Sequence, residues 1–109
     1  MKIGYATALL FLFTTPALPS NTQTDSGVTF TCALTGSDDS GFDIYAKNDG
    51  ATDKSCTAKC KLSKSSGGAQ EWEYSATVRA SAQRFWFGGE AGVSGAPLSN
   101  PDLTSASCH

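Results

Sequence analysis

Four cysteines constrain this 109-residue chain more than any other feature. They are Cys32, Cys56, Cys60 and Cys108, and all four lie downstream of an N-terminal segment that resembles an export signal. An even number of cysteines in a short exported chain is ordinarily a disulfide framework. Domains of this size bury too little surface to be very stable without such cross-links. We therefore expect a small exported domain held together by two disulfides.

Residues 1–20 have the composition of a secretory signal peptide. A lysine follows the initial methionine, residues 3–13 are largely apolar, and a short exit rich in small residues follows them. The apolar run is well short of the roughly twenty residues that cross a bilayer. We expect cleavage after Ala17 or after Ser20. The product is one domain over residues 21–109, periplasmic or secreted, with no membrane span.

Apolar and polar residues alternate with a period of two through most of the remaining chain, which is the pattern of half-buried strands. The expected strands cover residues 28–35, 42–47, 56–62, 71–80, 84–87 and 103–108. Gly, Asn, Asp and Ser clusters separate them, and no helical periodicity is evident. The pattern predicts an all-β, immunoglobulin-like antiparallel sandwich. Residues 20–27 are expected to form a loose polar leader.

The positions of the cysteines restrict how they can pair. Cys32, Cys56 and Cys60 fall on the apolar parity of their strands, so their sulfurs should face the core. Four residues along one strand cover about 13 Å, whereas a disulfide needs Cα atoms within about 7 Å. Pairing of Cys56 with Cys60 is therefore disfavoured. Cys32 can pair with either of them, while Cys108 takes the other.

Charged residues support one hairpin, formed by residues 56–62 and 71–78. One register places Lys61 opposite Glu71 and Lys59 opposite Glu73. Opposite charges across an antiparallel pair stabilise it by about 0.2–1 kcal/mol each. A neighbouring register instead sets Lys61 against Glu73 and pairs Thr57 with Thr77, and both registers stay open.

The sequence contains no strong catalytic, metal or nucleotide signature. Its one histidine is the last residue, His109, so a serine or cysteine nucleophile has no evident base. Glu71 and Glu73 lie on the solvent parity of a strand, where charge pairing with lysines is the better interpretation. Without the leader the net charge is −3, which disfavours nucleic acid as a partner. We expect no cofactor, no metal and no enzymatic activity.

The surface expected to meet a partner lies near residue 86. Alternation over residues 84–87 places two phenylalanines on one face and Arg84 with Trp86 on the other. Exposed Trp and Arg are residue types that anchor interfaces and stack on ligands. Residues 88–101 follow as a long Gly- and Pro-rich loop, of a length that is often functional. The hypothesis assigns contact to Arg84, Trp86 and Glu90, while the alternative packs Trp86 beneath the loop.

Residues 42–50, FDIYAKNDG, alternate and then run into a polar Asn-Asp-Gly turn. This stretch is similar to secreted bacterial immunoglobulin-like sandwiches, among them the adhesion-related CARDB-type modules. The resemblance implies an immunoglobulin-like fold with a binding or spacer role and no catalysis. The resemblance assigns a function to no individual residue of this chain.

The leading expectation is a non-enzymatic exported module that binds a protein or a glycan, or serves as a small structural component of the envelope. The second is a secreted inhibitor or effector that inserts the loop of residues 88–101 into a target. The third is a hydrolase that uses the carboxylates of Glu71 and Glu73.

Overall fold

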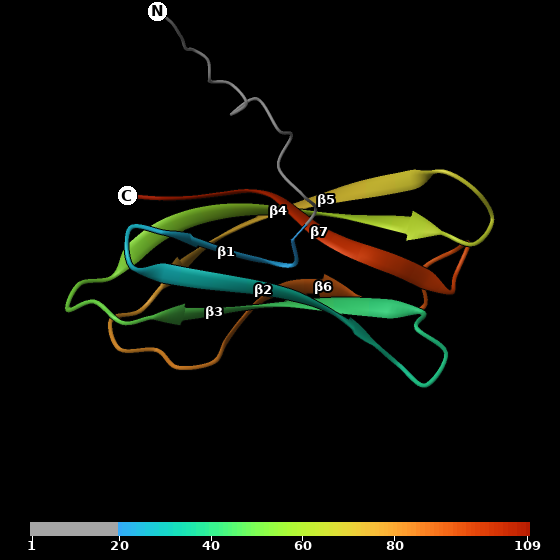
Figure 1. Cartoon of the computed structure of the whole chain (residues 1–109). Helices are drawn as coiled ribbons and strands as arrows, with labels where there is room; N and C mark the ends of the chain where they lie inside the picture. The colour runs from blue at the N-terminus through green and yellow to red at the C-terminus, as the bar shows by residue number, and fades with distance from the viewer. Residues whose placement is uncertain (1–19) are drawn as a thin grey trace, which may run out of the picture.

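A computed structural model describes residues 20–109 as two antiparallel sheets that pack face to face (Figure 1). The strands are β1 (Thr22–Asp25), β2 (Val28–Thr35), β3 (Gly41–Asn48), β4 (Lys54–Lys64), β5 (Ala69–Val78), β6 (Phe85–Glu90) and β7 (Leu98–Cys108). One sheet has the order β1-β2-β3-β6 and the other β5-β4-β7. The predicted all-β sandwich is confirmed.

The expected export signal falls almost entirely on residues 1–19, outside the described residues. From residue 20 to residue 109, the structure contains no helix of the length and apolarity needed to cross a membrane.

The strand order differs from the immunoglobulin order that the resemblance implied. In an immunoglobulin constant domain the second strand lies between the first and the fifth. Here β2 lies between β1 and β3, and β3 pairs with β6. Alternating residues predict that a strand has one buried face, but they do not specify which strand lies beside it.

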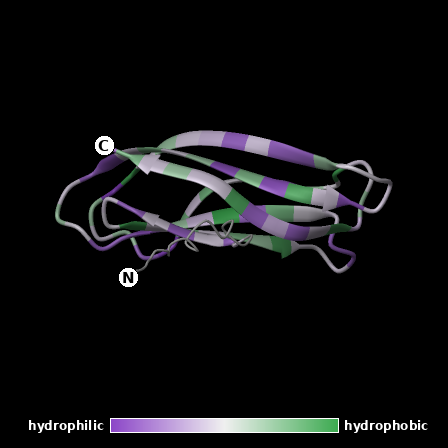
Figure 2. Ribbon diagram, turned by 45° about the horizontal axis from the view of Figure 1, so that its top comes forward, coloured by the Kyte–Doolittle hydropathy of each residue, from purple (hydrophilic) through white to green (hydrophobic). Residues whose placement is uncertain are grey.

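The core lies between the two sheets, and strands β2 to β7 contribute their apolar parity to it. Along the strands, green and purple segments alternate in Figure 2 as the pleat requires. Aromatic contacts join the sheets, with ring centroids 4.8 Å apart for Phe42 and Trp72. The fully buried large side chains include Phe30, Phe42, Ile44, Leu62, Leu98 and Leu103. Each contributes about 1.5–3 kcal/mol relative to an exposed position.

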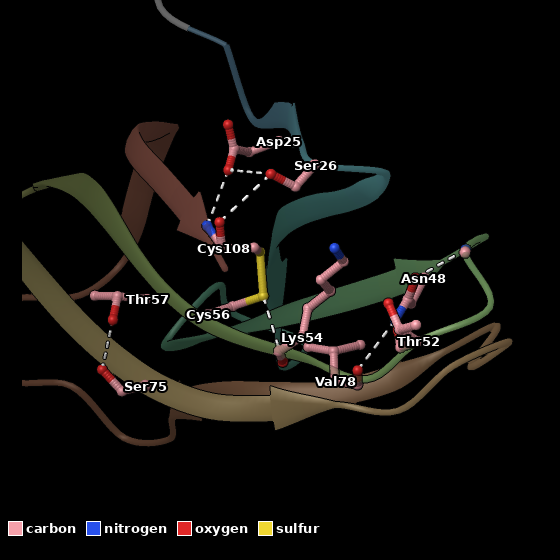
Figure 3. The surroundings of a disulfide bond; sticks show 11 residues. Asp25, Ser26, Asn48, Thr52, Lys54, Cys56, Thr57, Ser75, Val78 and Cys108 are labelled. Atoms are coloured by element: carbon pink, nitrogen blue, oxygen red, sulfur yellow. Dashed lines mark hydrogen bonds between the residues drawn. A yellow bond between two sulfur atoms is a disulfide. The ribbon is translucent and has the colours of Figure 1, made fainter.

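All four cysteines form disulfides, and one of the two open connectivities is realised. Cys32 pairs with Cys60 and so joins β2 of one sheet to β4 of the other. Cys56 pairs with Cys108 and joins β4 to β7 within one sheet (Figure 3). The expectation that Cys56 and Cys60 do not pair with each other is confirmed.

The register between β4 and β7 explains why Cys56 meets Cys108. Ser55 and His109 exchange both backbone hydrogen bonds, at 2.9 and 3.0 Å. The next pair along the ladder is Cys56 with Cys108. This is a non-hydrogen-bonded pair, the kind that brings opposite Cα atoms closest, and here they are 4.1 Å apart.

The hairpin of β4 and β5 adopts the first of the two expected registers. Lys59 lies opposite Glu73 and Lys61 lies opposite Glu71. Thr57 lies opposite Ser75 rather than Thr77, and their hydroxyl oxygens are 2.8 Å apart. The polar face of this sheet therefore pairs as the charge pattern indicates.

The expectation of a loose leader over residues 20–27 is wrong, because Thr22–Asp25 form strand β1. This strand has no apolar residue, so it gives no alternation signal. It is held by backbone pairing with β2, and the Gln23 side chain donates a hydrogen bond to the Leu103 carbonyl. A short polar edge strand is specified by its neighbours rather than by its own sequence.

The expectation of a long loop over residues 88–101 is also wrong. Strand β6 continues to Glu90 and β7 begins at Leu98, which leaves residues 91–97 as the connection. A Cβ on Gly88 would overlap the Tyr74 ring, so this glycine permits close packing between the sheets rather than a turn. The connection is tied down, since the Val93 amide donates to the carbonyl of residue 40 at 2.8 Å.

Candidate functional site

Strand β6 presents Trp86 to solvent, as the alternation predicts. Its neighbour Phe87 is 5% exposed and packs edge-on against Phe30, whereas Trp86 is 55% exposed. Among residues 20–109, Trp86 is the one large hydrophobic side chain that is exposed. The alternative in which residues 88–101 cover Trp86 is wrong.

The Trp86 ring is held in place from the neighbouring strand. Trp86 lies opposite Tyr45 of β3, so two aromatic side chains share the outer face of the sheet. The indole Nε1 donates a hydrogen bond of 2.8 Å to Oδ1 of Asp43, two residues away on the same face of β3. An indole whose N–H is hydrogen-bonded within the protein is held in one orientation, and just over half of the Trp86 surface remains exposed for contacts.

Arg84 immediately precedes β6 and covers Tyr45. Its Cζ lies 3.9 Å from the centroid of the Tyr45 ring, a distance typical of a cation–π contact. The one ion pair within 4.0 Å among residues 20–109 joins Lys47 and Asp49. The Arg84 guanidinium is therefore stacked on an aromatic ring without a carboxylate partner in the described part of the chain.

The third predicted contact residue, Glu90, does not lie with Arg84 and Trp86. Trp86 pairs with Tyr45, but the next residue of β3, Ile44, pairs with Gly88. One residue of β6 is thus extra, and this β-bulge reverses the alternation beyond it. Trp86 and Glu90 consequently face opposite sides of the sheet, although they are four residues apart.

Glu90 instead meets the opposite sheet. Its Oε2 accepts a hydrogen bond of 2.6 Å from the hydroxyl of Tyr74 on β5. Burial raises the pKa of Tyr74, and the hydrogen bond to Glu90 and the charge of that carboxylate raise it further. Tyr74 is therefore a neutral donor at physiological pH, and the pair links β5 to the end of β6.

A shallow depression of about 460 Å³ lies on the same outer face as Trp86. Its lining is mixed: Ala33, Leu34 and Ala46 contribute apolar surface, and the polar or aromatic side chains are Thr29, Thr31, Thr35, Asp43, Tyr45, Lys47, Gln83 and Arg84. Trp86 does not line the depression, but it is bonded to Asp43, which does. We call Asp43, Tyr45, Arg84 and Trp86 the Trp86 face.

The other candidate residues stand apart. Glu71 and Glu73 are exposed on the outer face of the three-stranded sheet, and Glu71 accepts a hydrogen bond from Thr104. His109 is exposed and pairs through its backbone with Ser55. From residue 20 onwards, no three His, Cys, Asp or Glu side chains are grouped so as to hold a metal ion.

Sequence reasoning missed Tyr45 and Asp43. Their outward parity was visible in the alternation of residues 42–47, but their position beside Trp86 depends on pairing of β3 with β6. These strands lie about forty residues apart and no local signal pairs them.

No family model matches this chain, and no curated protein or solved structure matches it.

Proposed function

We propose that this chain is a non-enzymatic, exported β-sandwich module that binds a partner, a protein or a glycan, through the Trp86 face. One observation carries the proposal: Trp86 is 55% exposed, and its ring is oriented by a hydrogen bond to Asp43. A large aromatic ring that is exposed and already ordered contributes to binding with little loss of side-chain entropy. Trp and Arg are the residues most often found at the centre of binding surfaces.

Export is supported by the two disulfides. Covalent sulfur links persist in oxidising compartments and are rare in the cytosol. A leader of signal-peptide composition precedes the domain in the sequence. In this proposal the domain acts in the periplasm or outside the cell.

The inhibitor and hydrolase alternatives receive less support. The inhibitor alternative uses residues 88–101 as a free loop, whereas only residues 91–97 connect β6 to β7 and the Val93 amide is hydrogen-bonded to the Ser40 carbonyl. Glu71 and Glu73 face solvent on the polar face opposite lysines, as charge-paired surface residues do.

Trp86→Ala tests the proposal. Immobilised wild-type protein, produced with its disulfides intact, is offered a panel of glycans and of envelope proteins, and binding partners are quantified. Trp86→Ala should lose binding by at least about tenfold, because hot-spot aromatic residues typically contribute about 2 kcal/mol or more.

Glu73→Gln is the matched control, since it changes an exposed residue on the opposite sheet. It should bind as the wild type does, and both variants should melt within about 2 °C of the wild type, as surface changes usually do. Undiminished binding by a folded Trp86→Ala variant would remove the Trp86 face from consideration.

A further inference from the structure

The two outer faces of the sandwich differ in a way that bears on the ligand. On the three-stranded sheet, the outward positions of β4 and β5 carry lysines, glutamates, serines and threonines. On the four-stranded sheet, Tyr45 and Trp86 lie opposite each other. Aromatic rings on an outer face are thus confined to one side of the molecule over residues 20–109.

The apolar part of the Trp86 face is too small for a typical protein interface. Stable protein interfaces bury about 1,200–2,000 Å² in total around an apolar centre. Trp86 is the one large hydrophobic side chain exposed among residues 20–109, and the threonine hydroxyls of the depression lie on β2, across β3 from it. A single exposed ring with hydroxyl groups farther along the same sheet face suits a sugar instead, because the C–H face of a pyranose stacks on an aromatic ring while its hydroxyls form hydrogen bonds.

The depression beside Trp86 supplies those hydrogen-bonding groups. Thr29, Thr31 and Thr35 of β2 line it together with Tyr45 of β3. Its volume of about 460 Å³ falls within the range of about 300–1,000 Å³ typical of small-ligand sites. An open depression of this size can hold a short oligosaccharide.

The cation Arg84 favours an anionic ligand. Lys47, Arg84 and the acidic Asp43 line the depression, but Lys47 forms an ion pair with Asp49 at 3.7 Å. Arg84 has no carboxylate within 4.0 Å in the described chain, although acidic residues outnumber basic ones overall. A guanidinium without an ion pair can bind a carboxylate or a sulfate through two parallel hydrogen bonds.

We propose that the ligand of the Trp86 face is a short acidic oligosaccharide: one sugar ring stacks on Trp86, and an anionic group on the sugar binds Arg84. This inference rests on the proposed binding function and narrows its ligand class. The threonine hydroxyls of β2 hold the neighbouring sugar hydroxyls. Asp43 orients the indole and also places a negative charge near the anion.

Calorimetric titration tests the inference with four probes: an oligogalacturonate, the same oligosaccharide with its carboxyl groups reduced, a sulfated heparin-derived oligosaccharide, and a single-stranded oligonucleotide. The protein is the oxidised product of the full chain. The oligogalacturonate or the sulfated probe should bind, and which of them binds more tightly identifies the anionic group. The reduced probe should bind at least about tenfold more weakly, a loss of about 1.4 kcal/mol.

Variants assign the binding energy to residues. Trp86→Ala should abolish detectable binding of the acidic probe, and Arg84→Met should weaken it about tenfold while keeping an apolar stem over Tyr45. Asp43→Asn keeps an oxygen acceptor for the indole but removes the charge, so it should strengthen acidic binding about two- to threefold. Lys59→Met and Glu73→Gln, on the opposite sheet, make the same charge changes and should leave the affinity unaltered.

Salt separates charge from stacking. Affinity for the acidic probe should fall several-fold between about 0.02 M and about 0.2 M salt, while that of Arg84→Met should change little. If Trp86→Ala proves unfolded by its melting curve, the affinity changes in Arg84→Met and Asp43→Asn still test the inference.

Several outcomes would overturn it. Equal affinity for the acidic and the reduced probe would exclude an acidic ligand and leave a binding role for the Trp86 face intact. The protein could also fail to bind any saccharide but bind a protein partner or the oligonucleotide in a way that depends on Trp86. That result would exclude an acidic oligosaccharide as the ligand and leave a binding role for the Trp86 face intact. Saccharide binding that survives in folded Trp86→Ala would overturn both this inference and the proposed function.

Discussion

Asn48 is a fully buried polar side chain, and all of its partners are backbone atoms. Its Nδ2 donates to the carbonyls of Thr52 and Val78, at 2.9 and 3.1 Å, and its Oδ1 accepts from the Gly50 amide at 2.9 Å (Figure 3). One amide thus ties the turn after β3 to the end of β5. A buried polar group that loses such a partner destabilises the folded protein, because water cannot reach it to replace the hydrogen bond.

Asn48→Ala should lower the free energy of unfolding by about 2–3 kcal/mol, because buried backbone groups lose their partners. Asn48→Asp should be at least as damaging, since it replaces two donors with acceptors facing carbonyls. Chemical denaturation followed by fluorescence measures both. Thr57→Ala, which removes the exposed hydroxyl pair with Ser75, should cost less than about 1 kcal/mol. Equal losses for Asn48→Ala and Thr57→Ala would contradict the role assigned to Asn48.

Gly88 is required by the ring that lies on it. A Cβ at this position would overlap Tyr74, so Gly88→Ala should destabilise the protein by about 1–3 kcal/mol through overpacking. In a Tyr74→Ala background the same substitution should cost much less. A double-mutant cycle measures this, with an expected coupling of about 1 kcal/mol or more. Additive losses would show that Tyr74 is not what excludes a side chain.

At the scale of elements, the two disulfides link different parts of the fold and differ in burial. Cys32–Cys60 spans 28 residues and links the sheets, whereas Cys56–Cys108 spans 52 residues and links neighbouring strands. Loop-closure entropy alone gives about 3.6 and about 4.1 kcal/mol, which is nearly the same contribution. The difference between the two disulfides in stabilisation therefore comes from burial. Cys32 and Cys60 are fully buried, whereas Cys108 is 9% exposed.

Replacing both members of Cys32–Cys60 with alanine should destabilise the domain more than the same change at Cys56–Cys108, by about 1–2 kcal/mol, because it leaves a cavity in the core. Urea unfolding of the two double variants measures the difference. In the wild type, mild reductant should open Cys56–Cys108 first, as mass spectrometry after alkylation would reveal. Faster reduction of Cys32–Cys60 would contradict this order.

Strand β1 begins with contacts that involve Ser20. The Ser20 carbonyl accepts a 2.7 Å hydrogen bond from the amide of Leu103, a buried residue of β7. Its own amide donates to Asp102 Oδ1 at 3.1 Å. A buried amide that loses its acceptor costs about 1–3 kcal/mol.

A chain that starts at Leu18 should therefore be more stable than one that starts at Asn21, by about 1–3 kcal/mol. Thermal melts of the two oxidised proteins make the comparison. Identical melting temperatures would show that Ser20 contributes nothing to the domain. In the proposed export, cleavage after Ala17 would retain these contacts, whereas cleavage after Ser20 would remove them.

At the scale of the whole molecule, a sandwich of this size has a thin core between two short sheets. Domains of about 90 residues bury roughly two thirds of their unfolded surface and gain only a few kcal/mol net. Two disulfides of about 2–4 kcal/mol each are thus comparable with the total stability.

Complete reduction should abolish the cooperative melting transition at and above about 37 °C, as it does in small disulfide-linked domains. Circular dichroism on reduced and alkylated protein measures this. A reduced chain that melts at the temperature of the oxidised one would show that the core suffices without the cross-links.

For most strands, the local pattern of the sequence determined which side faces inward. Phe87 is buried and Trp86 exposed because they are adjacent residues of one pleated strand. The charge pattern narrowed the hairpin of β4 and β5 to two registers, of which the structure has the one that pairs Lys59 with Glu73. The burial pattern and the narrowing to two registers follow from short-range geometry, which a sequence displays directly.

Only the tertiary structure decided the relations between distant segments. The pairing of β3 with β6 brings Tyr45 to Trp86, and the bulge beside it turns Glu90 toward Tyr74. The pairing of β4 with β7 joins Cys56 to Cys108. Such contacts depend on how the two sheets pack and on where a β-bulge shifts the register between strands. The local sequence around each residue does not reveal which distant residue it will contact.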